Sequence, residues 1–181
     1  MQRALVLLAE GFEEVEAVTP IDFLRRAGVE TTVAGVGARE ILGAHDIRIT
    51  VDITVEESTG QYDAVVLPGG AHGARGIAAD AASVELVRRA LHDGKLVAAI
   101  CASPGVVLGG HGLIGARRFT CYPGFESLVT GGTFVEERVV TDGNLITSRG
   151  PGTAAEFAEA IVSYLVGPEA ALDLHRRTLQ K

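Results

Sequence analysis

The 181-residue sequence predicts an α/β domain in which a mostly parallel central sheet carries helices on both faces. Three short apolar runs, residues 3–9, 62–67 and 96–100, have the unbroken hydrophobic character of strands buried on both sides. Longer segments with helical spacing lie between strands, as crossover connections of parallel strands require. The composition fits this class, because 47% of the residues are hydrophobic and only 5% are aromatic, which favours a core of Val, Ile, Leu and Ala.

The first half of the chain alternates between strand-like and helix-like segments. A helix is expected over residues 13–27, where apolar residues recur at helical spacing and Gly28 supplies a stop. Pro20 within it predicts a kink or a restarted helix, because proline lacks the backbone N–H and its ring crowds the preceding turn. Residues 30–36 form the next expected strand, and the alternation over residues 40–55 is typical of antiparallel or edge strands.

The second half continues the same alternation. An amphipathic helix over residues 83–92 precedes the third buried strand, and a further helix is expected from about Ala102 to the glycine-rich turn at residues 109–112. Residues 134–141 and 145–147 are expected to form an antiparallel hairpin around an Asp-Gly-Asn turn. Two closing helices are expected over residues 153–166 and 168–179. Since there is no linker-like or repetitive segment, residues 1–181 are interpreted as a single domain.

Charge, hydropathy and cysteine content exclude several classes of function. A formal net charge of −7 with scattered arginine pairs argues against a nucleic-acid partner, which requires clustered cations. No apolar stretch reaches the roughly 18 to 20 residues of a membrane span, and the first apolar run is too short for a signal peptide. Two cysteines make neither a disulfide framework nor a metal quartet. We therefore expect a cytoplasmic protein without a metal or another cofactor.

Three loops with unusual residues leave the ends of expected strands: residues 10–16, 68–76 and 101–105. In a parallel sheet, ligand sites form outside the carboxyl ends of the strands, so these loops are expected to converge. Cys101 follows a buried strand directly and opens a helix, where a side chain is exposed as in a nucleophile elbow and free N–H groups favour a thiolate. This position predicts a reactive, low-pKa cysteine; the alternative is an inert thiol that packs as a small hydrophobic residue.

The other two loops offer an oxyanion site and a carboxyl partner. Glycines 69 and 70 could present backbone N–H groups to an oxyanion beside the thiolate, although a plain turn is the alternative. Glutamates 13, 14 and 16 open the first helix, where acidic side chains are favoured in any case. A glutamate buried beside Cys101 would be protonated and could shuttle a proton, but spacing alone does not identify it.

No histidine has the context of a catalytic base. Of the five, His45 and His72 lie in segments that could approach the site, and the other three are expected at a helix end, in a glycine-rich turn and in the last helix. A cysteine hydrolase normally requires such a base, so this absence argues against that mechanism.

At these loops the chain resembles the ThiJ/PfpI superfamily, specifically its DJ-one branch. Four segments carry the resemblance in order: RALVLLAEGFEEVEAVTPIDFLRRAG, YDAVVLPGG, LVAAICASPGVVL and NLITSRGPGTAAEFAEAIV. The resemblance implies a flavodoxin-like three-layer sandwich, a homodimer, and a cysteine that is readily oxidised to sulfinate beside a protonated glutamate. It implies that Cys101 is the nucleophile, that Glu16 is the glutamate, and that the backbone of Gly69, Gly70 and Ala102 binds the oxyanion.

The resemblance also implies residues around the site, with two departures from the family pattern. Gly150 and Pro151 match a segment beside the site, and Arg26 matches a position near the dimer interface and the pocket. Tyr122 stands where the human-type member has a histidine, which favours a Cys–Glu dyad over a Cys–His mechanism. Ala102 stands where the protease-like branch has a histidine, so peptidase activity is not expected. Cys121 is either near the site or a half-buried structural thiol.

Two functions follow from the resemblance. The first is an enzyme acting on small reactive carbonyls, either a glutathione-independent glyoxalase (glyoxalase III) or a deglycase, through Cys101 and Glu16. The second is a non-enzymatic redox sensor or stress-response chaperone in which Cys101 is oxidised. The partner is accordingly a small carbonyl substrate or an oxidant. The superfamily's name suggests a thiamine-pathway role, which no residue of the sequence supports.

Overall fold

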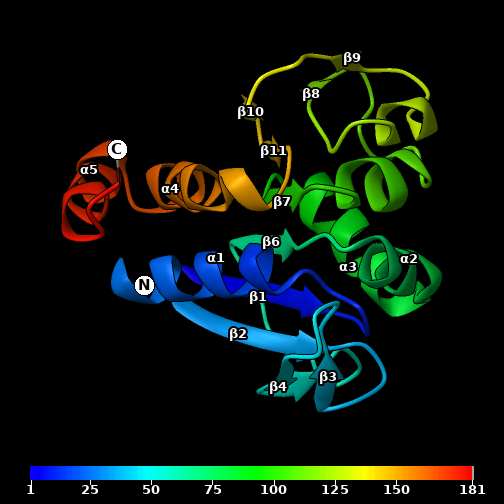
Figure 1. The fold of residues 1–181 in the computed structure, drawn as a ribbon, viewed down its shortest axis with the longest axis horizontal. Helices are drawn as coiled ribbons and strands as arrows, with labels where there is room; N and C mark the ends of the chain where they lie inside the picture. Colours follow the sequence, from blue (N-terminus) through cyan, green and yellow to red (C-terminus); the bar gives the residue numbers. More distant parts are fainter. Residues whose placement is uncertain (181) are drawn as a thin grey trace.

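A seven-stranded sheet forms the middle of three layers in the computed structural model, which describes residues 1–180 (Figure 1). Its strand order is β10-β11-β7-β6-β1-β2-β5. Every neighbouring pair is parallel except β10 and β11, which form the antiparallel hairpin at one edge. The strands are β1 (Arg3–Leu8), β2 (Glu30–Gly35), β5 (Ile53–Thr54), β6 (Ala64–Leu67), β7 (Leu96–Ile100), β10 (Val139–Asp142) and β11 (Leu145–Ser148). The predicted fold class is confirmed.

The central strands are buried on both faces because nearly all their side chains are apolar. All residues of β6 and β7 are buried, as are the last five of β1. Successive side chains point to opposite faces, so Leu5 and Leu7 join one hydrophobic cluster while Val6 and Leu8 join the other. Burial of each such aliphatic side chain contributes about 1.5 to 3 kcal/mol to stability.

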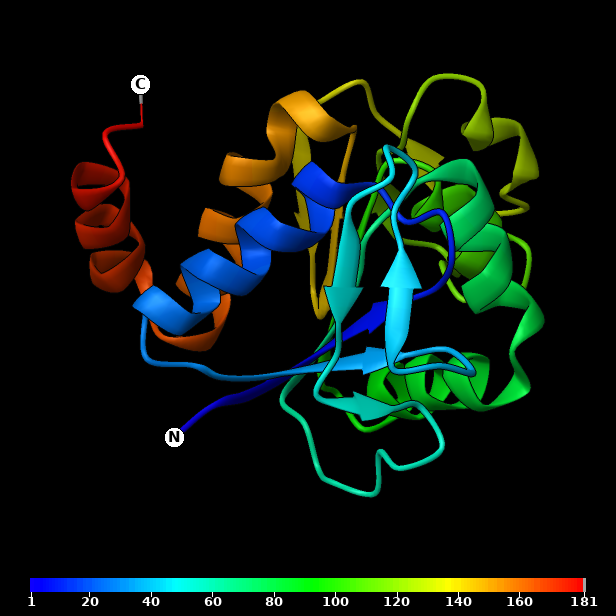
Figure 2. The same cartoon turned by 60° about the horizontal axis from the view of Figure 1, so that its bottom comes forward.

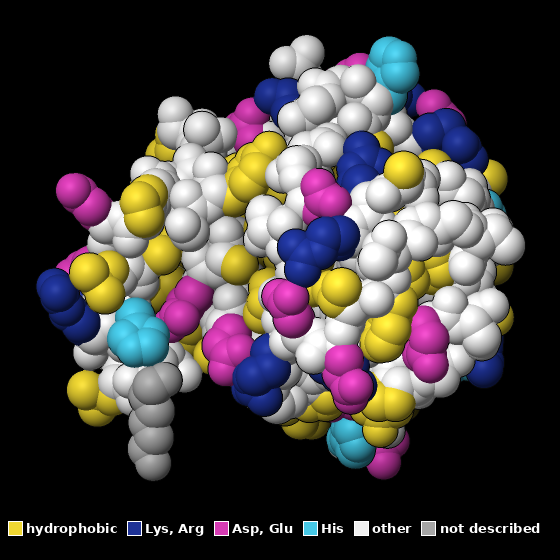
Figure 3. Space-filling view, turned by 90° about the horizontal axis from the view of Figure 1, so that it is seen from above, with side chains coloured by type: hydrophobic (Ala, Val, Ile, Leu, Met, Phe, Trp, Pro, Cys, Tyr) yellow, Lys and Arg dark blue, Asp and Glu magenta, His cyan; other side chains and the backbone are white. Residues whose placement is uncertain are grey.

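Helices cover both faces of the sheet. One face packs against α1 (Glu14–Arg26) and α4 (Ala154–Leu165), while α5 (Pro168–Arg177) packs against α4 and lies outside this layer (Figure 2). The other face packs against α2 (Ala71–Ala79) and α3 (Ala81–His92). Pro20 neither ends nor restarts α1, which runs unbroken through it. On the face drawn in Figure 3, acidic and basic side chains are interspersed with apolar ones.

Two small two-stranded sheets lie outside the central sheet. An antiparallel hairpin of β3 (Glu40–Leu42) and β4 (Arg48–Thr50) folds over the loop that follows β1. A short parallel pair joins β8 (Arg118–Phe119) to β9 (Thr133–Phe134). The single strand expected over residues 134–141 is therefore divided, because its start pairs with β8 and its end with β11.

The sequence prediction missed one helix and misjudged another. The sequence predicts a loop over residues 68–76, but residues 71–79 form α2, in which Gly73 and Gly76 allow close packing: a methyl group on Gly73 would lie 2.7 Å from Phe12 Cα. The segment after Ala102 is a wide π-helical turn over Pro104–Gly109, in which Gly110 N–H donates to Gly105 O at 3.0 Å. Within residues 1–180, no helix combines the length and apolar character needed to cross a bilayer.

Candidate active site

Cys101 occupies a strained turn at the carboxyl end of β7. Its φ is 65°, in the left-handed region that non-glycine residues seldom adopt and that costs on the order of 1 kcal/mol or more. The turn is fixed on both sides, since Cys101 N–H donates to Ser148 O and Cys101 O accepts from Tyr122 N–H, each at 2.9 Å. The thiol is only partly buried and lies between the two hydrophobic clusters. This geometry matches the turn that the sequence predicted.

Glu16 is the glutamate that reaches this turn. Its side chain projects from the first turn of α1 and is fully buried. Oε2 accepts a hydrogen bond of 2.8 Å from Gly69 N–H, while Oε1 is buried and has no hydrogen-bond partner among the described residues. Because an ionised carboxyl in such a place is poorly compensated, burial shifts the protonation equilibrium of Glu16 toward the neutral form.

Gly69 holds the thiol and the carboxyl together. A methyl group on this residue would lie 2.5 Å from both Cys101 Cβ and Glu16 Oε2, so only glycine allows this approach. Gly70, with a φ of 84°, follows it and caps α2. In this arrangement the Gly69 N–H, one of the predicted oxyanion donors, already donates to Glu16. The N–H groups of Gly70 and Ala102 are the ones that face the sulfur.

The pKa of Glu16 is shifted in the direction that the sequence analysis expects, whereas the pKa of Cys101 is shifted in the opposite direction. Burial raises the pKa of Glu16 to about 7, against smaller opposing contributions from Cys101 and the Gly69 N–H. Burial, and secondly the charge of Glu16, raise the pKa of the Cys101 thiol to about 12, although the Gly70 and Ala102 N–H groups oppose this. The low pKa expected for Cys101 is therefore corrected: two helix-terminal donors do not outweigh desolvation and a nearby carboxylate. Near neutral pH the thiol therefore keeps its proton, whereas Glu16 is present both as the carboxylic acid and as the carboxylate.

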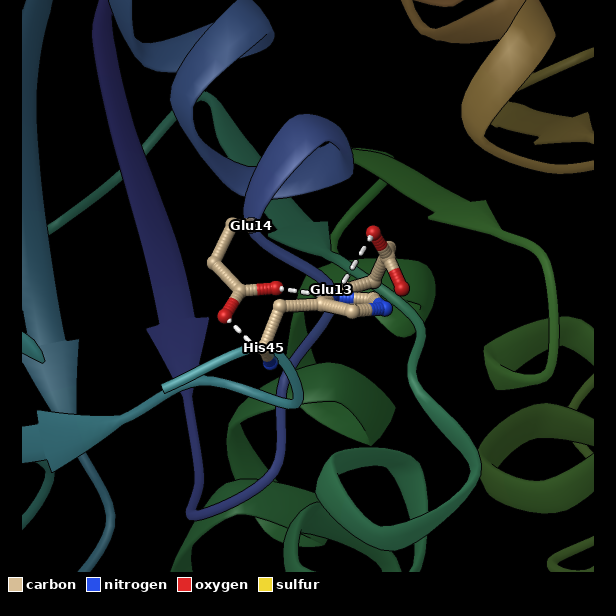
Figure 4. Close-up of side chains that lie close together, drawn as sticks. All are labelled: Glu13, Glu14 and His45. Atoms are coloured by element: carbon tan, nitrogen blue, oxygen red, sulfur yellow. Dashed lines mark hydrogen bonds and ion pairs between the residues drawn. The ribbon is translucent and has the colours of Figure 1, made fainter. Parts of the chain in front are cut away.

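The other two glutamates, Glu13 and Glu14, contact the turn of the β3–β4 hairpin. Glu14 is buried and accepts hydrogen bonds from His45 N–H at 2.7 Å and His45 Nδ1 at 2.9 Å, while Glu13 lies 3.6 Å from the same ring nitrogen (Figure 4). These contacts lower the pKa of Glu14 despite its burial and raise the pKa of exposed His45. His45 thus anchors the β3–β4 turn to the start of α1 and does not serve Cys101 as a base.

Two buried hydroxyls that the sequence analysis did not single out brace the site. Ser103 Oγ donates to Pro68 O at 2.5 Å, which ties the cysteine loop to the glycine loop. Ser148 Oγ is 2.6 Å from Thr153 Oγ1, which ties β11 to the segment that follows it. Ser103 stands two residues after the cysteine. Its hydroxyl group so close to Cys101 is a signal in the sequence that could have identified it.

A shallow hollow lies beside the pair. It measures about 240 Å³ and is lined by Tyr122, Pro123, Arg138, Arg149 and residues 150–153. Tyr122, Gly150 and Pro151 were all predicted near the site, and a methyl group on Gly150 would lie 3.2 Å from the Tyr122 ring and 3.9 Å from Glu16 Oε1. These residues therefore border the carboxyl end of Glu16.

Two predicted pocket residues do not line the hollow. Cys121, which precedes Tyr122, is completely buried in the core, where burial and then Glu126 raise its pKa to about 12. Arg26 ends α1, ten residues or about 15 Å along the helix from Glu16, and pairs with Asp22 at 2.6 Å. Within one chain, Arg26 contributes nothing to the site.

The fold and this cysteine–carboxyl pair define a class: the chain belongs to the DJ-1/PfpI family, which matches residues 2–164. It is 42% identical to the Parkinson disease protein 7 homolog of Danio rerio over 176 residues, 94% of the chain and 93% of the relative. It is 41% identical to Protein DJ-1 homolog B of Arabidopsis thaliana, where it covers only 40% of the relative's length. Glutathione-independent glyoxalase DJR-1.2 of Caenorhabditis elegans is 36% identical over 170 residues, 92% of the chain and 90% of the relative.

Solved structures show the same architecture. A DJ-1 superfamily protein from Salmonella typhimurium superposes with a TM-score of 0.97 at 35% identity, covering 100% of both chains. An oxidised DJ-1 of Toxoplasma gondii superposes with a TM-score of 0.96 at 35% identity, covering 99% of the chain and 98% of the neighbour. The resemblance found in the four sequence segments is thereby confirmed.

Proposed function

We propose that the protein is a glutathione-independent glyoxalase that converts α-oxoaldehydes such as methylglyoxal to 2-hydroxy acids. The observation that carries this proposal is the meeting of Cys101 and Glu16 at Gly69, which places a thiol beside a buried carboxyl group. The pKa of about 7 at Glu16 suits a group that accepts and returns protons near neutral pH. The Caenorhabditis elegans relative is named for this activity.

The first step is addition of the Cys101 thiol to the aldehyde carbon. The carbon–sulfur bond forms as the carbonyl π bond breaks, and the Glu16 carboxylate accepts the thiol proton. This route does not require a standing thiolate, which agrees with the raised pKa of the thiol. The Gly70 and Ala102 N–H groups would stabilise the alkoxide, and Glu16 then protonates it to give a hemithioacetal.

The second step is an internal redox exchange that Glu16 mediates. Its carboxylate removes the proton from the former aldehyde carbon and returns it to the neighbouring carbonyl carbon, while the hydroxyl proton on the first carbon moves to the oxygen of the second. The first carbon reaches the oxidation level of a thioester while the second is reduced to an alcohol, so no external oxidant or reductant takes part. Water then cleaves the thioester, which releases the 2-hydroxy acid and restores the Cys101 thiol.

Lactate formation from methylglyoxal without glutathione tests the proposal. The wild-type protein is expected to form lactate, and Cys101→Ala is expected to form none while it keeps the wild-type circular dichroism spectrum. Retention of the wild-type rate in a folded Cys101→Ala variant would show the proposal to be wrong.

A redox response is the second candidate, and one observation favours it. Cys101 is partly exposed whereas Cys121 is completely buried, and the Toxoplasma gondii neighbour was solved in an oxidised state. Oxidation by peroxide would convert the thiol to sulfenic and then sulfinic acid, with Glu16 hydrogen-bonding the product. Peptide mass analysis after mild peroxide is expected to find added oxygen on Cys101 and not on Cys121. Equal oxidation of the two thiols would rule out a tuned sensor.

A further inference from the structure

The hollow beside Glu16 has no assigned role in the steps described above. A methyl group on Gly150 would point between the Tyr122 ring, at 3.2 Å, and Glu16 Oε1, at 3.9 Å. Gly150 has a φ of 170°, which any residue adopts, so its backbone conformation does not require glycine. The missing side chain therefore keeps a gap open between the tyrosine ring and the buried carboxyl group.

The walls of the hollow are largely apolar. Tyr122, Pro123 and Pro151 line it, and the Tyr122 ring packs edge-on against Phe125 with 6.4 Å between centroids. This contact and the hydrogen bond from Tyr122 N–H to Cys101 O hold the ring beside the cysteine turn. Tyr122 therefore offers a fixed aromatic surface, although its side chain is 47% exposed.

Each of the two cations at the hollow lies near a carboxylate of the chain. Arg138 donates twice to Glu156, at 2.8 and 3.0 Å, and once to Gly152 O at 2.6 Å. Arg149 Nη2 lies 3.6 Å from Glu136, and its Nη1 is buried without a hydrogen-bond partner among the described residues. An anionic ligand would have to displace these carboxylates, so an uncharged group is favoured.

We propose that this hollow receives the substituent of the α-oxoaldehyde and that Tyr122 determines specificity for flat, uncharged substituents. The inference rests on the proposed function, because it concerns a substrate held on Cys101. The Tyr122 ring would cover the substituent on one face, while Gly150 leaves space for the bond that joins it to the reacting carbons. A substrate with an aryl group would fill this hollow better than one with a methyl group.

Steady-state kinetics with three matched substrates test this assignment: methylglyoxal, phenylglyoxal and 4-carboxyphenylglyoxal. The wild-type protein is expected to have a higher kcat/KM for phenylglyoxal than for the other two. Tyr122→Ala should lower the ratio of phenylglyoxal to methylglyoxal about tenfold. Tyr122→Phe, which keeps the ring, and Tyr164→Ala, which removes a comparably exposed tyrosine from α4, should keep that ratio. An unchanged ratio in Tyr122→Ala, or a preference for the carboxylated substrate, would overturn the inference.

A binding measurement separates this inference from the proposed function. The chain has three tyrosines, so selective labelling gives three resolvable sets of ring signals. Titration of labelled Cys101→Ser protein with acetophenone, which cannot be turned over, is expected to shift the Tyr122 signals and leave Tyr62 and Tyr164 unchanged, with acetone giving a smaller effect. Absence of turnover by wild-type protein would refute the proposed function alone, whereas absence of the Tyr122 shift would refute the inference.

Discussion

Cys101 and Glu16 approach each other across a glycine that leaves no room for a side chain. The thiol comes from the end of β7 and the carboxyl from the first turn of α1, and a methyl group on Gly69 would lie 2.5 Å from an atom of each. Gly69 N–H also fixes one oxygen of Glu16 at 2.8 Å. The close approach of these two side chains and the burial of Glu16 follow from the packing of α1 against the loop after β6.

Gly69→Ala is therefore expected to disrupt both stability and the site. The added methyl group would clash with Cys101 Cβ and Glu16 Oε2, and overpacking of this kind costs roughly 1 to 3 kcal/mol. Gly152→Ala is the matched control, because a methyl group there meets no atom within 4 Å. Urea unfolding of both variants checks the prediction, and equal midpoints would contradict it.

The positive φ of Cys101 predicts an inverted order of stability among its variants. At a φ of 65° an alanine retains the strain of a Cβ atom, whereas glycine relieves it. Cys101→Gly is expected to be more stable than Cys101→Ala by about 1 kcal/mol, although glycine normally costs stability through the unfolded chain. Thermal unfolding of the two inactive proteins gives the comparison; a more stable alanine variant would show that the turn is unstrained.

The raised pKa of Glu16 predicts that stability falls as pH rises. Its pKa is about 7 in the folded protein against 4.5 as the ordinary value, so between these pH values the folded state binds more protons than the unfolded state. Relative to Glu16→Gln, the wild type should lose roughly 3 kcal/mol between pH 4.5 and pH 7 and then level off. Urea denaturation across this range measures the difference.

Glu14 serves as a control, because its effect on the pH dependence of stability is expected to be opposite to that of Glu16. Since its folded pKa is lowered, its carboxylate stabilises the fold above the ordinary pKa, and this contribution is lost as pH falls through the folded value. Glu14→Gln should therefore approach wild-type stability only in acid. If stability relative to wild type changed with pH in the same direction for Glu14→Gln and Glu16→Gln, the opposite pKa shifts of the two glutamates would be contradicted.

The Glu14–His45 contacts predict local opening of the β3–β4 hairpin when they are removed. Glu14→Ala leaves the N–H groups of His45 and Ile47 without their acceptor, at a cost of about 1 to 3 kcal/mol in this hairpin. Hydrogen exchange should accelerate over residues 43–47 and stay unchanged in β6 and β7. Because the pKa of His45 is raised, its charged pairing is present at low pH and is lost as pH rises through the folded value.

The sequence alone predicts the frame of this site well. Unbroken apolar runs identified β1, β6 and β7, and the position of Cys101 after the last of these predicted its turn. Helix α2 was missed because Gly73 and Gly76 are typical of loops, whereas here they allow a helix to pack closely on Phe12 and Ala9. Whether a helix can contain these glycines depends on the tertiary contacts of that helix, and the local sequence pattern does not show those contacts.

The roles of the three glutamates depend on how α1 is rotated on the sheet. Only the family resemblance identified Glu16, since spacing within the helix start left the choice open, and the structure places Glu14 on the hairpin side instead. The direction of the Cys101 pKa shift could not be predicted either, because it depends on burial and on the charge of a residue 85 positions away in the sequence.

The rate of lactate formation from methylglyoxal by Glu16→Gln, beside wild type and Cys101→Ser at pH 7.5, tests the central claim most directly. Glutamine keeps an acceptor for Gly69 N–H but cannot carry the proton between the two carbons. Both variants are expected to lose at least about a hundredfold in kcat, in line with the loss of a general base or of the nucleophile. A Glu16→Gln protein with the wild-type rate would contradict the account.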